Sequence, residues 1–246
     1  MFKKELHIKK VRKMKEVLGI IPARGGSKGI PHKNMVELCG KPLIQYTFDA
    51  VCGSKMLTRC IVSTEDTMIK KYSEEQGFEV IDRPEELATD FTTTASVILY
   101  TLDFLKKKEN YIPEYVMILQ PTSPLRESED IDECIDLIQK KGASSVVSVM
   151  ELPHNYLPEK LMVLKHERLF FESKDGIKYT TRQMQRTLYA RNGAAIYLFK
   201  TSVIYETMSY YGDDCVPYIM PKCKSLDIDD YEDLELIKAW ILYCKQ

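Results

Sequence analysis

The sequence lacks any long apolar run, and no stretch of about 18 uncharged apolar residues occurs in its 246 positions. We therefore expect a soluble protein without a membrane partner. The sequence also lacks an excess of charge of either sign, because 35 basic and 36 acidic side chains leave a formal net charge of −1. A chain that binds nucleic acid would be more basic, so no nucleic acid partner is expected.

Cysteines with the spacing of a metal site or a disulfide framework are also missing. The seven cysteines are odd in number and scattered, and none forms a C-x-x-C pair. A reducing cytoplasm is therefore the expected location. Residues 1–16 form a basic N-terminal extension, with seven lysines or arginines against two glutamates. No apolar segment follows within this extension, so no secretory signal is expected.

What the sequence does contain, from residue 17 onward, is an alternation of short apolar segments with segments of helical period. This alternation is typical of βαβ units, so we predict an α/β fold with a mainly parallel sheet. Residues 17–246 are expected to form a single domain. Strands are predicted at 17–21, 59–63, 78–81, 115–119, 144–149, 194–199 and 216–220, and helices at 42–51, 65–76, 94–107, 128–140 and 230–245.

Residues 151–191 lose this alternation. They contain two prolines, two short apolar pieces at 161–164 and 169–171, and a polar stretch at 173–176 with the composition of a hairpin turn. We predict a small protruding hairpin arm that leaves the main sheet. Such an insertion can serve as a lid or as a dimerisation element, and an ordinary surface hairpin is an equal alternative.

The loop after the first predicted strand, PARGGSKGIPHKN at residues 22–34, combines glycines with basic side chains. In a parallel sheet the ligand crevice lies at the carboxyl ends of the strands, and glycine lets backbone N–H groups surround phosphate oxygens. Arg24, Lys28 and Lys33 would neutralise a polyanionic ligand there. The spacing of the glycines matches neither a Walker loop nor a dinucleotide fingerprint, which disfavours a Walker ATPase and an NAD enzyme. A glycine-rich turn with solvated lysines is the alternative.

A pair of aspartates lies near the carboxyl end, in SLDIDD at residues 225–230. If the segment is extended, Asp227 and Asp229 point to one face and the intervening apolar residues to the other. Close carboxylates are stabilised by a cation, and Mg²⁺ takes one or two carboxylates together with phosphate oxygens and water. The pair therefore indicates a magnesium site, and Asp230 is expected to cap the last helix. Acidic capping alone is the alternative.

Three further polar clusters lie at 83–94, 120–126 and 182–193, the first two directly after predicted strands. Their uncharged donors and acceptors could contact a base or a sugar. Each cluster also has an ordinary explanation, as a helix cap, a proline turn or a solvated cation. The four histidines are dispersed without partner spacing, so none is assigned to catalysis.

Taken in order, seven motifs resemble those of the N-acylneuraminate cytidylyltransferase family, the CMP-sialic acid synthetases and their bacterial relatives that act on other nonulosonic acids. The motifs are IIPARGGSKGIPHKN, GKPLIQYT, IVSTED, RPEELATD, LQPTSPLR, NGAAIY and SLDIDDYEDL, and the resemblance covers residues 17–246. It implies a three-layer Rossmann-like nucleotidyltransferase fold with CTP and Mg²⁺ as co-reactants. It also implies a homodimer in which the arm can complete the neighbouring site.

The resemblance assigns roles to individual residues. Arg24 and Lys33 correspond to cations that contact the triphosphate. Ser27 and Lys28 lie in the same loop, and Gln120 corresponds to a sugar-acid position. The remaining correspondences are Asn34, Arg83, Thr92 and Thr94 with nucleotide contacts, and Asp227 and Asp229 with metal ligands.

Arg182 corresponds to an arginine that is active in vertebrate members and lies ten residues before the Asn-Gly pair. The chain departs from some relatives here, with two residues between Tyr189 and Asn192 in place of one. Relatives that use the eight-carbon acid KDO typically lack the pair formed here by Lys33 and Asn34. This difference favours a nine-carbon substrate.

The predicted function is that of a cytidylyltransferase. CTP would react with a nine-carbon 2-keto sugar acid, such as sialic acid, KDN or legionaminic acid, to give a CMP-sugar and pyrophosphate. One alternative is a nucleotidyltransferase for KDO or another sugar. An alternative from another class is a non-catalytic nucleotide-binding protein, against which the intact Arg24, Lys33, Asp227 and Asp229 argue.

Overall fold

The computed structural model describes residues 15–173, 186–191, 193 and 195–244. Its centre is an eight-stranded sheet with the order β10-β7-β11-β6-β1-β4-β5, in which β12 also pairs with β7. These strands are β1 (Val17–Pro22), β4 (Arg59–Thr64), β5 (Glu79–Asp82), β6 (Tyr115–Ile118), β7 (Ser145–Glu151), β10 (Tyr189–Arg191), β11 (Tyr197–Lys200) and β12 (Cys215–Ile219). The predicted α/β fold is confirmed.

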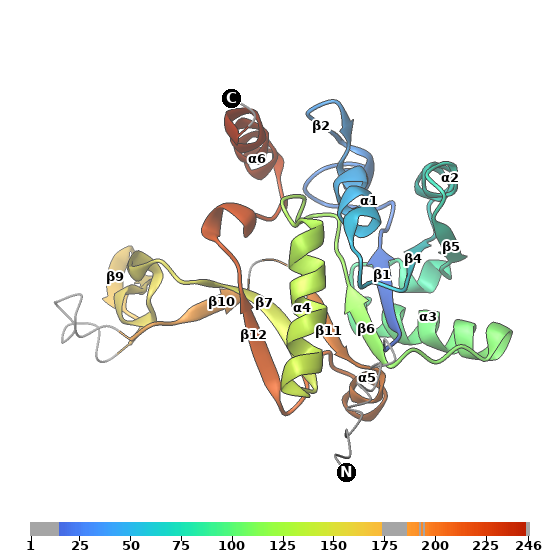
Figure 1. Ribbon diagram of the computed structural model, residues 1–246. Helices are drawn as coiled ribbons and strands as arrows, with labels where there is room; N and C mark the ends of the chain where they lie inside the picture. The colour runs from blue at the N-terminus through green and yellow to red at the C-terminus, as the bar shows by residue number, and fades with distance from the viewer. Residues whose placement is uncertain (1–14, 174–185, 192, 194, 245–246) are drawn as a thin grey trace, which may run out of the picture.

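Helices cover both faces of this sheet (Figure 1). The helices are α1 (Leu43–Gly53), α2 (Thr67–Glu75), α3 (Thr94–Glu109), α4 (Ser128–Lys141), α5 (Thr201–Thr207) and α6 (Tyr231–Cys244). In the central strand β1, Val17 and Ile21 belong to a core with α1, α2 and α4, whereas Leu18 and Ile20 belong to a second core with α3 and α5. Burial on both faces explains the continuous apolar run of β1. The three-layer arrangement is confirmed.

Strand directions divide the sheet into two parts. The pairs β1–β4, β1–β6, β4–β5 and β7–β12 are parallel. The pairs β6–β11, β7–β11 and β7–β10 are antiparallel. The sheet is therefore mainly parallel, as predicted, and its antiparallel pairs lie where the chain returns from the arm.

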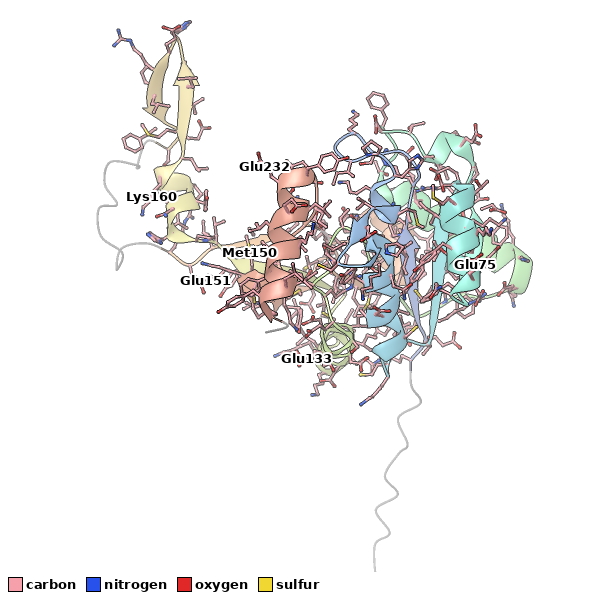
Figure 2. The ribbon with its side chains drawn as sticks, turned by 90° about the horizontal axis from the view of Figure 1, so that it is seen from above. Glu75, Glu133, Met150, Glu151, Lys160 and Glu232 are labelled. Atoms are coloured by element: carbon pink, nitrogen blue, oxygen red, sulfur yellow. The ribbon has the colours of Figure 1, made fainter. Side chains whose placement is uncertain are left out.

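A hairpin arm leaves the sheet after β7 and projects away from the rest of the molecule (Figure 2). Its strands β8 (Met162–Lys165) and β9 (Arg168–Phe171) are antiparallel. The two residues between them, His166 and Glu167, have φ angles of 48° and 61°, which are typical of a type I′ turn. The hairpin is confirmed, but its turn precedes the polar stretch at 173–176, of which 174–176 lie outside the described residues.

A third, smaller core joins the two ends of the sequence. It contains Ile30 from the loop after β1, Leu38 from the short hairpin of β2 (Glu37–Leu38) and β3 (Lys41–Pro42), and Ile237 from α6. Ile228, which lies between the two predicted metal ligands, is fully buried in the same core. This packing brings the glycine loop and the aspartate segment together.

The N-terminal extension predicted for residues 1–16 lies outside the described residues apart from its last two. Of these, Lys15 forms an ion pair with Glu114. The helix predicted from residue 65 starts two residues later, because the Asp66 side chain caps it by accepting from the N–H groups of Met68 and Ile69. Within the described ranges, no helix has the length and apolar character needed to cross a membrane.

Candidate active site

A cavity of about 310 Å³ lies at the carboxyl ends of β1, β5 and β6. Ten of the predicted site residues line it, namely Arg24, Ser27, Lys33, Asn34, Arg83, Thr92, Thr94, Gln120, Asp227 and Asp229. Lys28 lies outside this lining, and Arg182 lies outside the described residues. The fold therefore brings the glycine loop and the C-terminal aspartates to one cavity, as their shared small core requires.

Three contacts hold the glycine loop in place. The Gly25 N–H donates to Glu65 Oε1 at 2.8 Å, and Asn34 Nδ2 donates to the Arg24 carbonyl at 2.9 Å. A Cβ on Gly29 would lie 2.1 Å from the backbone oxygen of Asp229, so only glycine allows the loop to pack this closely. The backbone around Arg24 is thus fixed independently of the Arg24 side chain.

The cations of this loop pair with carboxylates. Arg24 Nη1 lies 2.9 Å and Lys28 Nζ 3.1 Å from the carboxylate of Asp90, and hydrogen bonds from Lys28 and Arg24 lower the pKa of Asp90. Lys33 Nζ donates to the Ile228 carbonyl at 2.8 Å and lies 3.3 Å from Asp229. Lys33 therefore connects the glycine loop directly to the aspartate segment.

The two aspartates face the cavity, while Ile228 between them is buried, so the predicted alternation is confirmed. Ser123 Oγ donates to Asp227 Oδ1 at 3.0 Å. Gly193, with φ of 60°, packs so closely that a Cβ there would lie 2.5 Å from Asp227 Cγ. Burial raises the pKa of Asp227, and the nearby Asp229 raises it further.

Such a carboxylate pair suits a hard divalent cation, which would offset the cost of ionising Asp227. No cluster of three or more His, Cys, Asp or Glu side chains that could hold a metal occurs in the described part of the chain. Two carboxylates are enough for Mg²⁺ when phosphate oxygens and water complete its coordination. Asp230 next to this pair caps α6, accepting from Glu232 and Asp233 N–H groups, as predicted.

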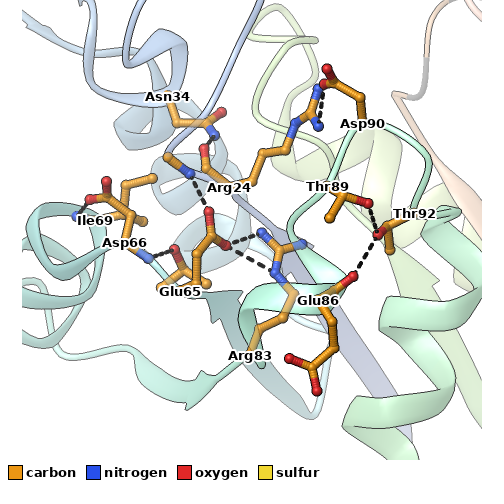
Figure 3. Close-up of polar contacts among 12 residues, drawn as sticks. Arg24, Asn34, Glu65, Asp66, Ile69, Arg83, Glu86, Thr89, Asp90 and Thr92 are labelled. Carbon is orange, nitrogen blue, oxygen red and sulfur yellow. Dashed lines mark hydrogen bonds and ion pairs between the residues drawn. The ribbon is translucent and has the colours of Figure 1, made fainter.

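The residues of 83–97 that line the cavity include three threonines, Thr89, Thr92 and Thr94, together with the charged Arg83 and Asp90. Arg83, Thr89, Asp90 and Thr92 are drawn in Figure 3. Thr92 Oγ1 donates to the Glu86 carbonyl at 3.1 Å and lies 2.9 Å from Thr89 Oγ1. Thr93, and not its neighbours, caps α3 by accepting from the Ser96 N–H. Thr92 and Thr94 are therefore left lining the cavity, which is compatible with their predicted nucleotide contact.

Arg126 holds the loop that carries Gln120. Arg126 is 2% exposed, and its guanidinium donates to the carbonyls of Gln120 and Ala195 and to Thr47 Oγ1. Burial lowers the pKa of Arg126 to about 10. Arg126, Glu65 and Ser123 were not among the residues predicted from the sequence. Glu65 follows the end of β4, much as Gln120 follows the end of β6. This position at a strand end is the signal that would have identified Glu65.

The fold and the cavity first define a class of protein. The solved structure of CMP:2-keto-3-deoxy-manno-octonic acid synthetase complexed with CTP superposes with a TM-score of 0.67, covering 94% of this chain and 100% of that one at 15% identity. At this identity the likeness concerns the fold alone. The chain is thus an α/β protein with the three-layer, Rossmann-like nucleotidyltransferase fold.

Sequence comparisons then give the family. The cytidylyltransferase family model matches residues 18–246, and the chain belongs to that family. N-acylneuraminate cytidylyltransferase of Escherichia coli is 34% identical over 223 residues, 90% of this chain and 51% of that protein. CMP-N,N'-diacetyllegionaminic acid synthase of Legionella pneumophila is 33% identical over 217 residues, 87% of this chain and 90% of that protein. The chain spans about half the length of the Escherichia coli relative.

Proposed function

We propose that the protein is a cytidylyltransferase that activates a nine-carbon 2-keto sugar acid with CTP, giving a CMP-sugar and pyrophosphate. The observation that carries this proposal is the meeting of Arg24 and Lys33 with Asp227 and Asp229 in one cavity. Cations suit a triphosphate, and a carboxylate pair suits the divalent ion that a triphosphate brings with it.

In this reaction the anomeric hydroxyl of the sugar acid attacks the α-phosphorus of CTP in line. The bond to the bridging oxygen of the β-phosphate breaks, and pyrophosphate and the hydroxyl proton leave. Phosphoryl chemistry of this kind depends on positioning and on stabilisation of negative charge. Arg24 and Lys33 supply charge, the N–H groups of the glycine loop supply donors, and Gln120 contacts the sugar acid.

The metal fits the same arrangement. Asp227 and Asp229 would hold Mg²⁺, whose charge when bound stabilises the phosphate oxygens and lowers the pKa of a hydroxyl that it contacts. Asp227 has little room to move, because Ser123 and Gly193 contact it. A fixed carboxylate with an unfavourable ionised state is a suitable metal ligand, since the metal offsets that cost.

The choice of a nine-carbon acid rests on sequence. Two relatives, at 34% and 33% identity, are named for N-acylneuraminate and for N,N'-diacetyllegionaminic acid. The pair formed by Lys33 and Asn34 also favours a nine-carbon acid over KDO.

A cytoplasmic location is supported by the seven cysteines, which are all unpaired thiols, as is typical of a reducing compartment.

We expect turnover in a panel that combines CTP, UTP, ATP or GTP with sialic acid, KDN, legionaminic acid, pseudaminic acid or KDO. Pyrophosphate release should require CTP, a nine-carbon acid and Mg²⁺, and chelation by EDTA should abolish it. Turnover with KDO alone would favour the KDO alternative. CTP binding without turnover of any acid would favour a non-catalytic nucleotide-binding protein.

We also propose that the arm forms a homodimer interface. Met162 and Leu164 of β8 pair with Phe171 and Leu169 of β9, so the four side chains share one face of the hairpin. Their exposed fractions are 45%, 68%, 43% and 62%. A two-stranded hairpin with a fully apolar exposed face is unstable in water alone, so a second copy of the arm is its natural partner.

Replacing Leu164 and Leu169 together by lysine should convert the dimer to a monomer, because charges would then lie in the apolar contact. Light scattering coupled to size-exclusion chromatography measures the change. Replacing Lys165 and Arg168, which lie opposite one another on the other face, by alanine is the matched control and should leave a dimer. A monomeric wild-type protein, or a dimeric double-lysine variant, would contradict this assignment.

A further inference from the structure

Glu65 connects two parts of the cavity without lining the cavity itself. Its Oε1 accepts from the Gly25 N–H at 2.8 Å, and its Oε2 accepts from Arg83 Nη2 at 2.5 Å and Nε at 3.1 Å (Figure 3). The side chains of Glu65 and Arg83 are only 17% and 4% exposed. One shielded carboxylate therefore holds both the glycine loop and the guanidinium on the opposite wall.

The backbone around Glu65 is held from both sides. Glu65 directly follows β4 and precedes Asp66, whose side chain caps α2. The carbonyl of Ser63 accepts from Ala23 N–H at 3.0 Å, and that of Thr64 accepts from Arg83 N–H at 2.9 Å. The ends of β1, β4 and β5 are thus tied together around Glu65, so its carboxylate has a fixed position.

Glu65 also changes the chemistry of Arg83. A guanidinium has five N–H donors, and two of the donors of Arg83 are used by Glu65. The positive charge of Arg83 is balanced by the same carboxylate. The remaining donors are therefore better suited to neutral acceptors, such as the carbonyl and ring nitrogen of a base, than to a further phosphate. Arg24 also pairs with a carboxylate, that of Asp90, but its side chain is 37% exposed, against 4% for Arg83, and is therefore more open to a polyanion.

We infer that Glu65 is a positioning residue that couples the two halves of the nucleotide site. Through Oε2 it orients and neutralises Arg83 for contact with the nucleoside, and through Oε1 it holds the glycine loop for the triphosphate. This inference rests on the proposed function, because it takes a cytidine nucleotide as the ligand. The two contacts use different oxygens, so they can be separated by substitution.

Glu65→Gln should affect mainly the Arg83 side. The glutamine oxygen can still accept from Gly25, while its amide nitrogen faces the donors of Arg83 and cannot accept from them. Glu65→Ala removes both contacts. The probes are CMP, which reports on the nucleoside side, and inorganic tripolyphosphate, which reports on the loop, with binding of each measured by titration calorimetry.

We expect Glu65→Gln to weaken CMP binding by about tenfold or more and tripolyphosphate binding by less than about threefold. Glu65→Ala should weaken both by about tenfold. In turnover, the KM for CTP should rise by about tenfold for Glu65→Gln, with kcat at saturating CTP within about fivefold of wild type. A merely structural role would not separate the two probes in this way.

Glu79→Gln is the matched control, because Glu79 pairs with Arg59 at the opposite end of the same two strands and should leave both affinities unchanged. If the two Glu65 variants do not fold, Glu65→Asp keeps the charge but is too short to reach both partners, and should weaken at least one probe by about tenfold. Equal effects on both probes in Glu65→Gln, or no effect, would overturn the inference. Failure of wild type to bind CTP would instead overturn the proposed function.

Discussion

Arg24→Ala should lower kcat for pyrophosphate release by about 10²- to 10⁴-fold while leaving the melting temperature within about 2 °C of wild type. The Arg24 guanidinium lines the cavity, where negative charge accumulates on the departing pyrophosphate. The fold should survive, because Asn34 and Glu65 hold the loop through its backbone and the ion pair of Arg24 with Asp90 is partly exposed. An assay of pyrophosphate release over time measures kcat, and thermal denaturation measures the melting temperature.

Asp90→Asn is the control for this experiment. It removes the same ion pair but keeps the guanidinium, so it should retain turnover within about tenfold of wild type. Arg24→Lys should recover only part of the lost activity, since an ammonium group cannot bind phosphate oxygens through two parallel donors. Turnover by Arg24→Ala near the wild-type rate would remove Arg24 from the proposed chemistry.

The fold was predictable where burial acts locally. The predicted strands coincide with those of the structure to within three residues, since β1, β6 and most of β7 are buried on both faces and leave continuous apolar runs. The direction of β11 is not encoded in such a run, because it depends on where the arm returns to the sheet. Helix α5 has seven residues, too few to show a helical period, and no prediction included it.

The turn of the arm could not be predicted from the sequence either. Its turn is made by His166 and Glu167, both with positive φ, although this pair is not one of the Asn-Gly, Asp-Gly or Gly-Gly sequences typical of a type I′ turn. Composition therefore predicted the turn at the glycine-containing stretch 173–176. The two apolar pieces at 161–164 and 169–171 did locate the strands β8 and β9 correctly.

The site was predictable where side chains face the ligand directly. The glycine loop and the alternation of Asp227 and Asp229 follow from strand ends and from period two, and both are found in one cavity. Glu65 and Arg126 could not be found in this way, because each acts through another group. The helical pattern that begins at Glu65 assigned it to α2. Arg126 lay in the cluster at 120–126, which was interpreted as a contact to a base or sugar or as a proline turn.

Asp227→Asn should abolish turnover, with a decrease of about 10³-fold or more, because the amide keeps the shape of the side chain but removes a charged metal ligand. The Ser123 hydroxyl can still donate to the remaining oxygen, so the loop should be retained. The stabilisation that wild type gains from CTP and Mg²⁺ should disappear, since the pair no longer holds the ion. Asp103→Asn is the control and should leave turnover unchanged, because Asp103 lies on α3 and its carboxylate accepts a hydrogen bond from Tyr205 of α5.

The same variant should be more stable than wild type without ligands. Burial and the nearby Asp229 raise the pKa of Asp227 in the folded state above its ordinary value of 3.8. Asp227 therefore costs nothing below pH 3.8, and its ionisation reduces the free energy of unfolding as the pH rises through the folded-state pKa. Asn carries no such cost, so at pH 7 the ligand-free variant should melt at a higher temperature than wild type. The gain should vanish below pH 3.8. A variant that is inactive and also less stable at pH 7 would show that Asp227 supports the fold, whereas inactivity with higher stability identifies a carboxylate kept for the metal at the expense of stability.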